Sequence, residues 1–321
     1  MADSTSSPRI HRLAVLTAVA TVGLIVAGGL VTSTESGLSV PDWPTSYGWS
    51  PFTFPVSKWV GGIRFEHTHR LLASAVGFLT AVLSFALARR DSRVWVRRLG
   101  YAAVGAVVTQ GVLGGLTVLF LLPTAISVAH AFVAQTFFCL ILTLAIVTSP
   151  RWREAPVSAP DGLTRIGATT VAVIFLQLLI GAVMRHSEAG LAIPDFPLAF
   201  GRIVPRMSSF GVEIHFAHRI GALAVAALVF VCMWRAARSG RRGLWKMSAF
   251  LGALVLFQIV LGASTVLSRK NVLITTAHVA TGALLLGGAL AFTLATRRGG
   301  RVRESAARLG SLAGRESFAW K

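Results

Sequence analysis

The sequence contains eight long runs that carry almost no charged residues. A run of about 17 or more apolar residues is long enough to cross the hydrocarbon core of a membrane. The whole chain is 54% hydrophobic and only 13% charged, whereas about 25% of the residues of a soluble domain are charged. The sequence therefore predicts an all-α integral membrane protein with eight transmembrane helices. The predicted spans are residues 13–31, 71–88, 99–123, 124–149, 166–184, 216–234, 247–268 and 271–296.

The distribution of positive charge indicates how these helices are oriented. Most of the 31 Lys and Arg residues lie in the N-terminal arm, in alternate loops and in the C-terminal tail. Segments rich in Lys and Arg stay on the cytoplasmic side of a membrane, so we expect both termini to be cytoplasmic. The same bias accounts for the net charge of +19. We therefore expect no nucleic-acid partner. The expected location is the cell inner (plasma) membrane, with the lipid bilayer around the helices.

The second half of the chain repeats motifs of the first half. The segment TESGLSVPDWPTSYG at residues 34–48 returns as SEAGLAIPDFPLAFG at residues 187–201, and QGVLGGLTVL returns later as QIVLGASTVL. Because each copy holds four helices, the two copies have the same orientation in the membrane. We predict two parallel four-helix-bundle repeats, residues 1–150 and residues 151–321, joined by a Pro-rich linker at residues 149–162. The second repeat ends in a basic cytoplasmic tail.

Four histidines lie in the predicted spans or at their outer ends. His69 and His218 occupy equivalent places in the two copies, and so do His130 and His278. A single histidine in a membrane helix is more often a hydrogen-bonded packing group than a ligand. Ionisable groups at membrane depth are nevertheless costly and usually functional, and here they recur in both repeats. The pattern therefore indicates one functional pair in each half, toward the outer side of the membrane.

Two histidines on facing helices are suited to holding one flat metal cofactor. Haem iron accepts imidazole as an axial ligand, and the core of a helix bundle is where such sites are built. One pair per half then predicts two haems. Zinc is a weaker alternative because it requires three or four converging ligands, and a proton relay remains open. The predicted axial ligands of the haem iron are His69, His130, His218 and His278.

An arginine directly follows one histidine of each pair. Arg70 and Arg219 lie at the water-facing ends of their spans. The propionates of haem are carboxylates, and Arg is a suitable partner for a carboxylate in such a place. We expect both arginines to bind propionates. The alternative is an interfacial arginine that places its charged end in water.

Together these motifs resemble the haem A synthase family over residues 13–296. The resemblance rests on TESGLSVPDWP and its echo AGLAIPDFPL, on EHTHR and HFAHR, and on the AH motifs of the two remaining histidines. It implies a membrane oxidoreductase that converts a methyl group of haem O into the formyl group of haem A for cytochrome oxidase. It also implies that haem O synthase is a partner of the chain and that the chain takes part in cytochrome oxidase assembly. The electron acceptor is not identified.

The same resemblance gives the two halves different tasks. The N-terminal half, with His69 and His130, would hold haem O as the substrate. The C-terminal half, with His218 and His278, would hold a haem b that stays bound. Some members have a cysteine pair in the first outer loop, and this chain has no cysteine there. It therefore resembles the cysteine-less members, in which a loop disulfide cannot pass electrons.

Glu66 distinguishes the first half from the second. It lies three residues before His69, so on a helix the two side chains share one face, and the matching position of the second half holds His215. Oxidation of a methyl group requires a proton acceptor, and a buried carboxylate near the haem can take this role. We expect Glu66 to be the catalytic base. A charge that complements the helix dipole is the alternative.

Other polar residues are expected to have structural or interfacial positions. His67 points away from both of its neighbours, so we expect it at the interface, and we expect His186 to be polar surface. Asp42 and Asp195 lie in Pro-flanked turns, which favours a role in loop architecture. The two cysteines fall in apolar spans and are expected to be small packing residues; they are Cys139 and Cys232.

Two other classes of protein remain compatible with the pattern. A dihaem cytochrome b that passes electrons from a quinol would have the same four histidines but no special role for Glu66. A repeat-built transporter would have helices broken near the bilayer midplane, whereas the prolines here cluster in outer loops and in the linker.

In a synthase, two histidines on the substrate iron leave no open position for dioxygen. That favours removal of electrons followed by addition of water.

Overall fold

All eight predicted membrane helices are present in the structure. The computed structural model describes residues 8–152 and 162–316, and the side chains of most of these up to residue 297. In this part of the chain, eight helices are long and apolar enough to cross a membrane, so the chain is a multi-pass membrane protein. The helices are α1 Pro8–Ser33, α2 Ile63–Arg90, α3 Val94–Leu119, α4 Thr124–Thr148, α5 Leu163–His186, α6 Phe210–Arg238, α7 Arg242–Leu267 and α8 Val272–Glu316.

Most of the helices extend beyond the uncharged runs that predicted them. The helix α2 begins at Ile63, so the EHTHR motif lies within its first turns and not in the preceding loop. The helix α6 begins at Phe210, where the side chain of Ser209 accepts a hydrogen bond from the backbone N–H of Val212. Such a cap supplies a partner for one of the free N–H groups of the first turn. The ends of these membrane helices therefore include charged residues, which lie where the helix meets water.

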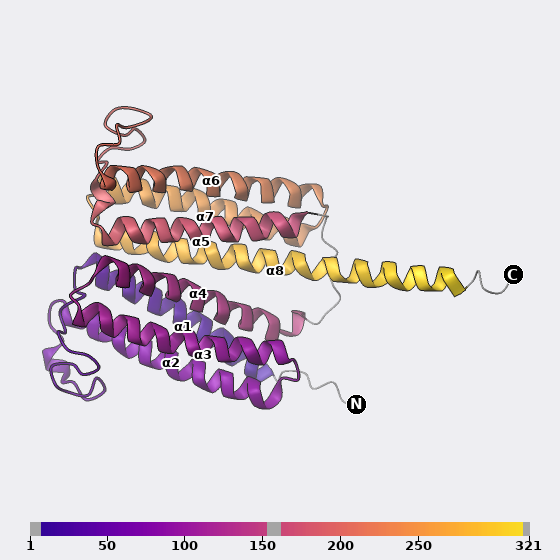
Figure 1. Ribbon diagram of the computed structural model, residues 1–321, viewed down its shortest axis with the longest axis horizontal. Helices are drawn as coiled ribbons and strands as arrows, with labels where there is room; N and C mark the ends of the chain where they lie inside the picture. Colours follow the sequence, from indigo (N-terminus) through magenta and orange to yellow (C-terminus); the bar gives the residue numbers. More distant parts are fainter. Residues whose placement is uncertain (1–7, 153–161, 317–321) are drawn as a thin grey trace.

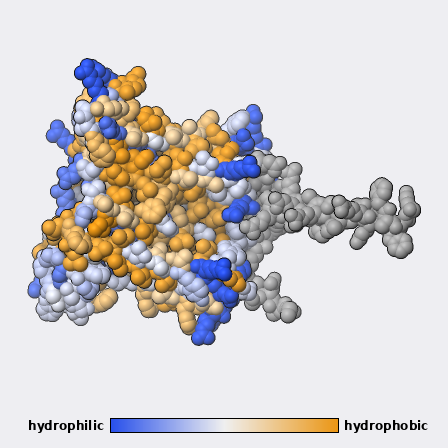
Figure 2. All heavy atoms as spheres, in the orientation of Figure 1, coloured by the Kyte–Doolittle hydropathy of each residue, from blue (hydrophilic) through white to orange (hydrophobic). Residues whose placement is uncertain are grey.

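The helices form two groups that lie side by side (Figure 1). One apolar core joins α1, α2, α3 and α4, and a second joins α5, α6, α7 and α8. The two groups meet through α1, α4, α5 and α8. The outer surface of the helices is largely apolar in the view of Figure 2, as expected for a surface that faces lipid.

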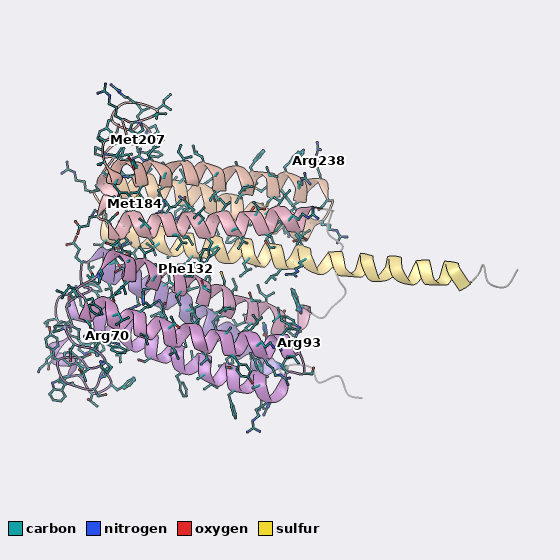
Figure 3. All side chains as sticks on the ribbon, viewed as in Figure 1. Arg70, Arg93, Phe132, Met184, Met207 and Arg238 are labelled. Carbon is teal, nitrogen blue, oxygen red and sulfur yellow. The ribbon has the colours of Figure 1, made fainter. Side chains whose placement is uncertain are left out.

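Both long loops lie at the same end of the molecule. The loop before α2 covers one group of helices and the loop before α6 covers the other (Figure 1). Figure 3 places Arg70 and Met207 at this end, and Arg93 and Arg238 at the opposite end. The membrane-spanning helices run unbroken, which does not agree with a transporter built on broken helices. The central part of the predicted linker, residues 153–161, and the last residues of the tail, 317–321, lie outside the described residues.

Candidate functional site

Each of the four predicted ligand histidines lies against a glycine of the preceding helix. A Cβ atom added to any of these glycines would lie about 3 Å from the imidazole Cε1 atom and would crowd the ring. The Cβ–Cε1 distances are 3.1 Å for Gly28 and His69, 3.2 Å for Gly114 and His130, 2.9 Å for Gly181 and His218, and 3.1 Å for Gly262 and His278. The same contact thus occurs four times, at matching positions of the sequence repeat.

The rings of the two histidines of the C-terminal half lie close together, at a separation that suits two ligands of one metal ion. The centroids of the His218 and His278 rings are 6.4 Å apart, with the ring planes at 66°. An imidazole nitrogen lies about 2 Å from a metal it binds, so two rings on opposite sides of one ion have centroids roughly 6 Å apart. This pair therefore fits two axial ligands of one haem iron.

The two histidines of the N-terminal half are half-buried and lie near each other. His69 and His186 both lie near enough to His130 to act on it electrostatically. The Nδ1 atoms of His69 and His130 are buried, and each lacks a hydrogen-bond partner among the described residues. Buried polar atoms without a partner are uncommon, which agrees with a site that completes its contacts when a ligand binds. The prediction that His186 is polar surface is wrong, because this second-half residue is half-buried beside the N-terminal site.

The glycine contacts lead to a prediction with a matched control in the same helix. Gly262→Ala should displace the imidazole of His278, because overpacking a buried contact costs about 1–3 kcal/mol. Gly243→Ala is the control, since nothing lies within 4 Å of a Cβ atom there. We expect only the first variant to lower the melting temperature and to weaken the binding of added haem, measured by its visible spectrum. Equal behaviour of the two variants would contradict the contact.

Arg70 connects α2 to the first outer loop through four hydrogen bonds. Its Nη1 donates to the carbonyl oxygens of Asp42 at 2.7 Å and Thr45 at 2.9 Å. Its Nη2 donates to the carbonyl oxygen of Val40 at 2.9 Å and to Oε1 of Glu66 at 2.7 Å. All four terminal N–H groups of the guanidinium are directed to these acceptors, which leaves the Nε–H. The sequence did not predict these partners, and the propionate contact stays a prediction.

Arg219 makes the equivalent connection in the second half. Its Nη2 donates to the carbonyl oxygens of Ile193 at 3.2 Å and Asp195 at 2.6 Å, and its Nη1 donates to that of Leu198 at 2.8 Å. These acceptors match those of the first half in the sequence repeat. Each arginine therefore holds its outer loop against the helix that carries a candidate ligand.

The two aspartates of the repeat stabilise the turns of the outer loops, as predicted. Asp42 accepts hydrogen bonds from the backbone N–H groups of Tyr47 at 2.6 Å and Gly48 at 2.8 Å. Partial burial raises the pKa of Asp42, but these bonds and one from Thr45 outweigh it, so the pKa lies below its usual value. Asp195 accepts the corresponding bonds from Phe200 and Gly201, which also lower its pKa. Both side chains are therefore carboxylates near neutral pH.

Glu66 and His215 hold the same loop position in the two halves with different chemistry. Oε2 of Glu66 accepts the backbone N–H of Val40 at 2.8 Å, and Nδ1 of His215 accepts that of Ile193 at 3.3 Å. Glu66 is only 4% exposed and forms an ion pair with Arg70. The backbone of Ser39 also hydrogen-bonds its side chain, which leaves one of the roughly four lone-pair sites of the carboxylate free. The group can therefore anchor the loop and also accept a proton.

His67 lies beneath the first outer loop and not at the interface, so the sequence prediction for it was wrong. It is 0% exposed. Its Nδ1 lies 3.2 Å from the hydroxyl oxygen of Ser46, and its ring centroid lies 4.9 Å from that of Phe54 and 4.8 Å from that of Trp59. The loop folds back over the start of α2 and covers this side chain, which its position in the helix alone could not indicate.

The whole chain can now be compared with known proteins. The family described as cytochrome oxidase assembly protein (COX15-CtaA) matches residues 11–59 and 63–290. The chain belongs to the COX15-CtaA family. The match includes both outer loops, all four candidate ligand histidines and the four glycines against which they lie. The candidate sites of this COX15-CtaA chain therefore lie within the residues that match the family.

Three relatives of this COX15-CtaA chain are named heme A synthase. The chain is 32% identical to heme A synthase of Symbiobacterium thermophilum over 266 residues, covering 79% of this chain and 84% of the relative. It is 28% identical to heme A synthase of Halalkalibacterium halodurans over 275 residues, covering 82% and 89%. It is 25% identical to heme A synthase of Shewanella oneidensis over 311 residues, covering 84% and 92%. The similarity thus extends over nearly the whole length of each protein.

Proposed function

We propose that this chain is a haem A synthase, an oxidoreductase that converts a methyl group of haem O into the formyl group of haem A. The observation that carries the proposal is a half-buried pair of histidines in each half, in a chain whose listed relatives are named heme A synthase. These names do not support the alternative of a dihaem cytochrome b. The family description connects the product to cytochrome oxidase assembly, and haem O synthase is the expected source of the substrate.

The two histidine pairs have different tasks in this proposal. His69 and His130 hold haem O in the N-terminal half, residues 1–150. His218 and His278 hold haem b in the C-terminal half, residues 151–321, and the ring separation of 6.4 Å supports this assignment. When bound, the iron of haem b supplies a centre that can accept and release electrons. Arg70 and Arg219 complete the proposed haem contacts. They would use their remaining N–H groups to bind the propionates.

Glu66 is the proposed proton acceptor. Conversion of a methyl group into a formyl group removes electrons and protons and adds one oxygen atom, for which we propose water as the source. A carboxylate that is buried and already ionised can take a proton during this reaction. Glu66 is buried, and its pair with Arg70 favours the ionised form. The corresponding position of the second half holds an imidazole that already accepts a loop N–H, so this proton acceptor is present in one half only.

The proposed arrangement in the membrane follows from the charge distribution and the position of the sites. The four histidines lie near the end of the helices that carries the long loops. The opposite end carries the clusters rich in Lys and Arg that favour the cytoplasm. We therefore place both termini in the cytoplasm and the haem sites toward the outer side of the inner membrane. The two helix groups are parallel repeats in this arrangement.

The function can be tested by identifying the haems that the chain makes. The chain is produced together with haem O synthase in cells that lack haem A, and the extracted haems are analysed by mass. We expect a species with the mass of haem A in addition to haem O and haem b. Haem O without any oxidised product, in cells where the purified chain contains haem, would contradict the proposal and support an electron-transfer protein.

A further inference from the structure

Arg185 lies at the end of α5, where the two halves of the molecule meet. Figure 3 places the preceding residue, Met184, at the end that carries the long loops. The Nη2 atom of Arg185 donates to the hydroxyl oxygen of Ser33 at 2.8 Å and to the carbonyl oxygen of Gly29 at 3.4 Å, both in α1. The hydroxyl of Thr276 in α8 donates to the same Ser33 oxygen at 3.2 Å. The guanidinium therefore lies where α1, α5 and α8 meet.

This place adjoins the histidine pair of the C-terminal half. Arg185 lies four residues after Gly181, the glycine against which His218 lies. Residues four apart share one face of a helix, so Arg185 is one turn nearer to the looped end on the face that meets the imidazole. Its charge is also near enough to His278 to act on it electrostatically. Arg185 therefore lies beside both histidines of this pair, on the side of the long loops.

The guanidinium of Arg185 has few partners for a charged group in such a place. The side chain is half-buried, and no carboxylate of the described residues forms an ion pair with it. Its Nε–H and Nη1–H groups make no hydrogen bond within the described part of the chain. Removing a charge from water is costly unless the charge is paired. The position is therefore suited to an anion that these residues do not supply.

The other two arginines near the histidine pairs have fewer unused donors. The terminal N–H groups of Arg70 are directed to the first outer loop and to Glu66. Those of Arg219 donate to three carbonyl oxygens of the second outer loop. The position of the first half that corresponds to Arg185 in the sequence repeat holds Thr32. The unused guanidinium donors of Arg185 thus belong to the C-terminal pair and have no equivalent at the matching position of the other half.

We propose that Arg185 binds a carboxylate of the haem held by His218 and His278, namely one of its propionates. This inference rests on the proposed function only for the assignment of a haem to this pair. A guanidinium is suited to a carboxylate because its planar set of N–H donors matches the two carboxylate oxygens. The hydrogen bond to Ser33 holds the guanidinium in place, so the same residue connects the haem of one half to a helix of the other half.

The test compares haem b with its dimethyl ester, in which both propionates are uncharged. Full-length His69→Ala protein, purified in a detergent without phospholipid, is titrated with each compound, and binding to the C-terminal pair is followed by the visible spectrum. With Arg185 present, haem b should bind more tightly than the ester. Arg185→Met should weaken the binding of haem b by about 10–100-fold, the range for a hydrogen bond between charged groups. The same substitution should change the binding of the ester little.

Three further variants in the same background separate the charge from the connection between the helices. Arg185→Lys keeps a positive charge and should keep part of the preference for haem b. Ser33→Ala removes the hydroxyl that Arg185 contacts but leaves the guanidinium, so the preference should remain even if thermal unfolding shows a less stable protein. Arg185→Gln removes the charge but keeps an N–H donor, and should lose the preference as Arg185→Met does.

The midpoint potential of the bound haem b gives a second measurement. A positive charge close to the iron disfavours its oxidised form, so Arg185→Met and Arg185→Gln should lower the potential. Arg185→Lys should leave it close to that of the protein with Arg185. A residue that only joins the helices would not produce this dependence on charge.

The outcomes distinguish this contact from the proposed function. If Arg185→Met and Arg185→Gln weaken haem b and its ester by the same factor, Arg185 only holds the helices together and the propionate contact is wrong. If both variants keep the full preference for haem b while the chain makes haem A, the contact is wrong and the synthase stands. If the preference is lost as expected but the chain makes no haem A, the synthase is wrong and the contact stands.

Discussion

Replacing His218 or His278 by Ala is expected to remove the haem b that we propose for the C-terminal half. Either change deletes one of the two proposed ligands, whose ring centroids lie 6.4 Å apart. A tightly bound cofactor stabilises the folded state by about 3–4 kcal/mol when it is present at 100–1,000 times its dissociation constant, so these variants should also unfold at lower temperature. His69→Ala or His130→Ala should leave haem b bound while the formation of haem A stops.

The four variants are compared by pyridine haemochrome analysis, thermal unfolding and mass analysis of the haem product. His186→Ala is a suitable control, because this residue lies beside His130 without a place in either pair. It should retain haem b and show activity close to that of the parent protein. Equal loss of haem b from all four histidine variants would show that the division of tasks between the two halves is wrong.

The sequence was sufficient to predict the eight helices and the placement of four histidines near one end of α2, α4, α6 and α8. Both depend on properties that are visible along the chain, namely the length of the uncharged runs and the recurrence of the same residues in the repeat. The glycines that seat the histidines also recur at matching positions. A search for repeated glycines on the preceding helices could therefore have found them.

The partners of the outer-loop residues could not be predicted in the same way. Arg70 binds carbonyl oxygens in a loop more than 20 residues before it, and main-chain acceptors leave no pattern in the sequence. His67 was expected at the interface, because nothing along the chain shows that the loop with Phe54 and Trp59 folds over it. His186 lies near a histidine of the other half, which depends on how α4 and α5 pack.

Glu66→Gln is expected to lower the yield of haem A by about 10²–10⁴-fold, which corresponds to roughly 3–5 kcal/mol of additional barrier. Glutamine has nearly the same size, and its single oxygen can still accept the backbone N–H of Val40. Its amide nitrogen then faces Nη2 of Arg70, so the pair with Arg70 is lost while the contact to Val40 is kept. Haem O should still bind, because His69 and His130 are unchanged. A partly oxidised hydroxymethyl haem should accumulate if the second oxidation depends on the carboxylate more than the first. The haem species are identified by mass.

The alternative for Glu66 is a structural role as the anchor of the first outer loop. Glu66→His distinguishes the two roles, because His215 makes the corresponding contact to Ile193 in the second half. If Glu66 is only an anchor, the histidine variant should keep the loop in place and remain active, as shown by limited proteolysis of the loop and by haem A yield. A helix-dipole effect is smaller still, about 0.3–1 kcal/mol, and would change stability more than product. An intact loop and bound haem O with little haem A in both variants would assign the proton to Glu66, since loss of the pair with Arg70 has then disturbed neither the loop nor substrate binding.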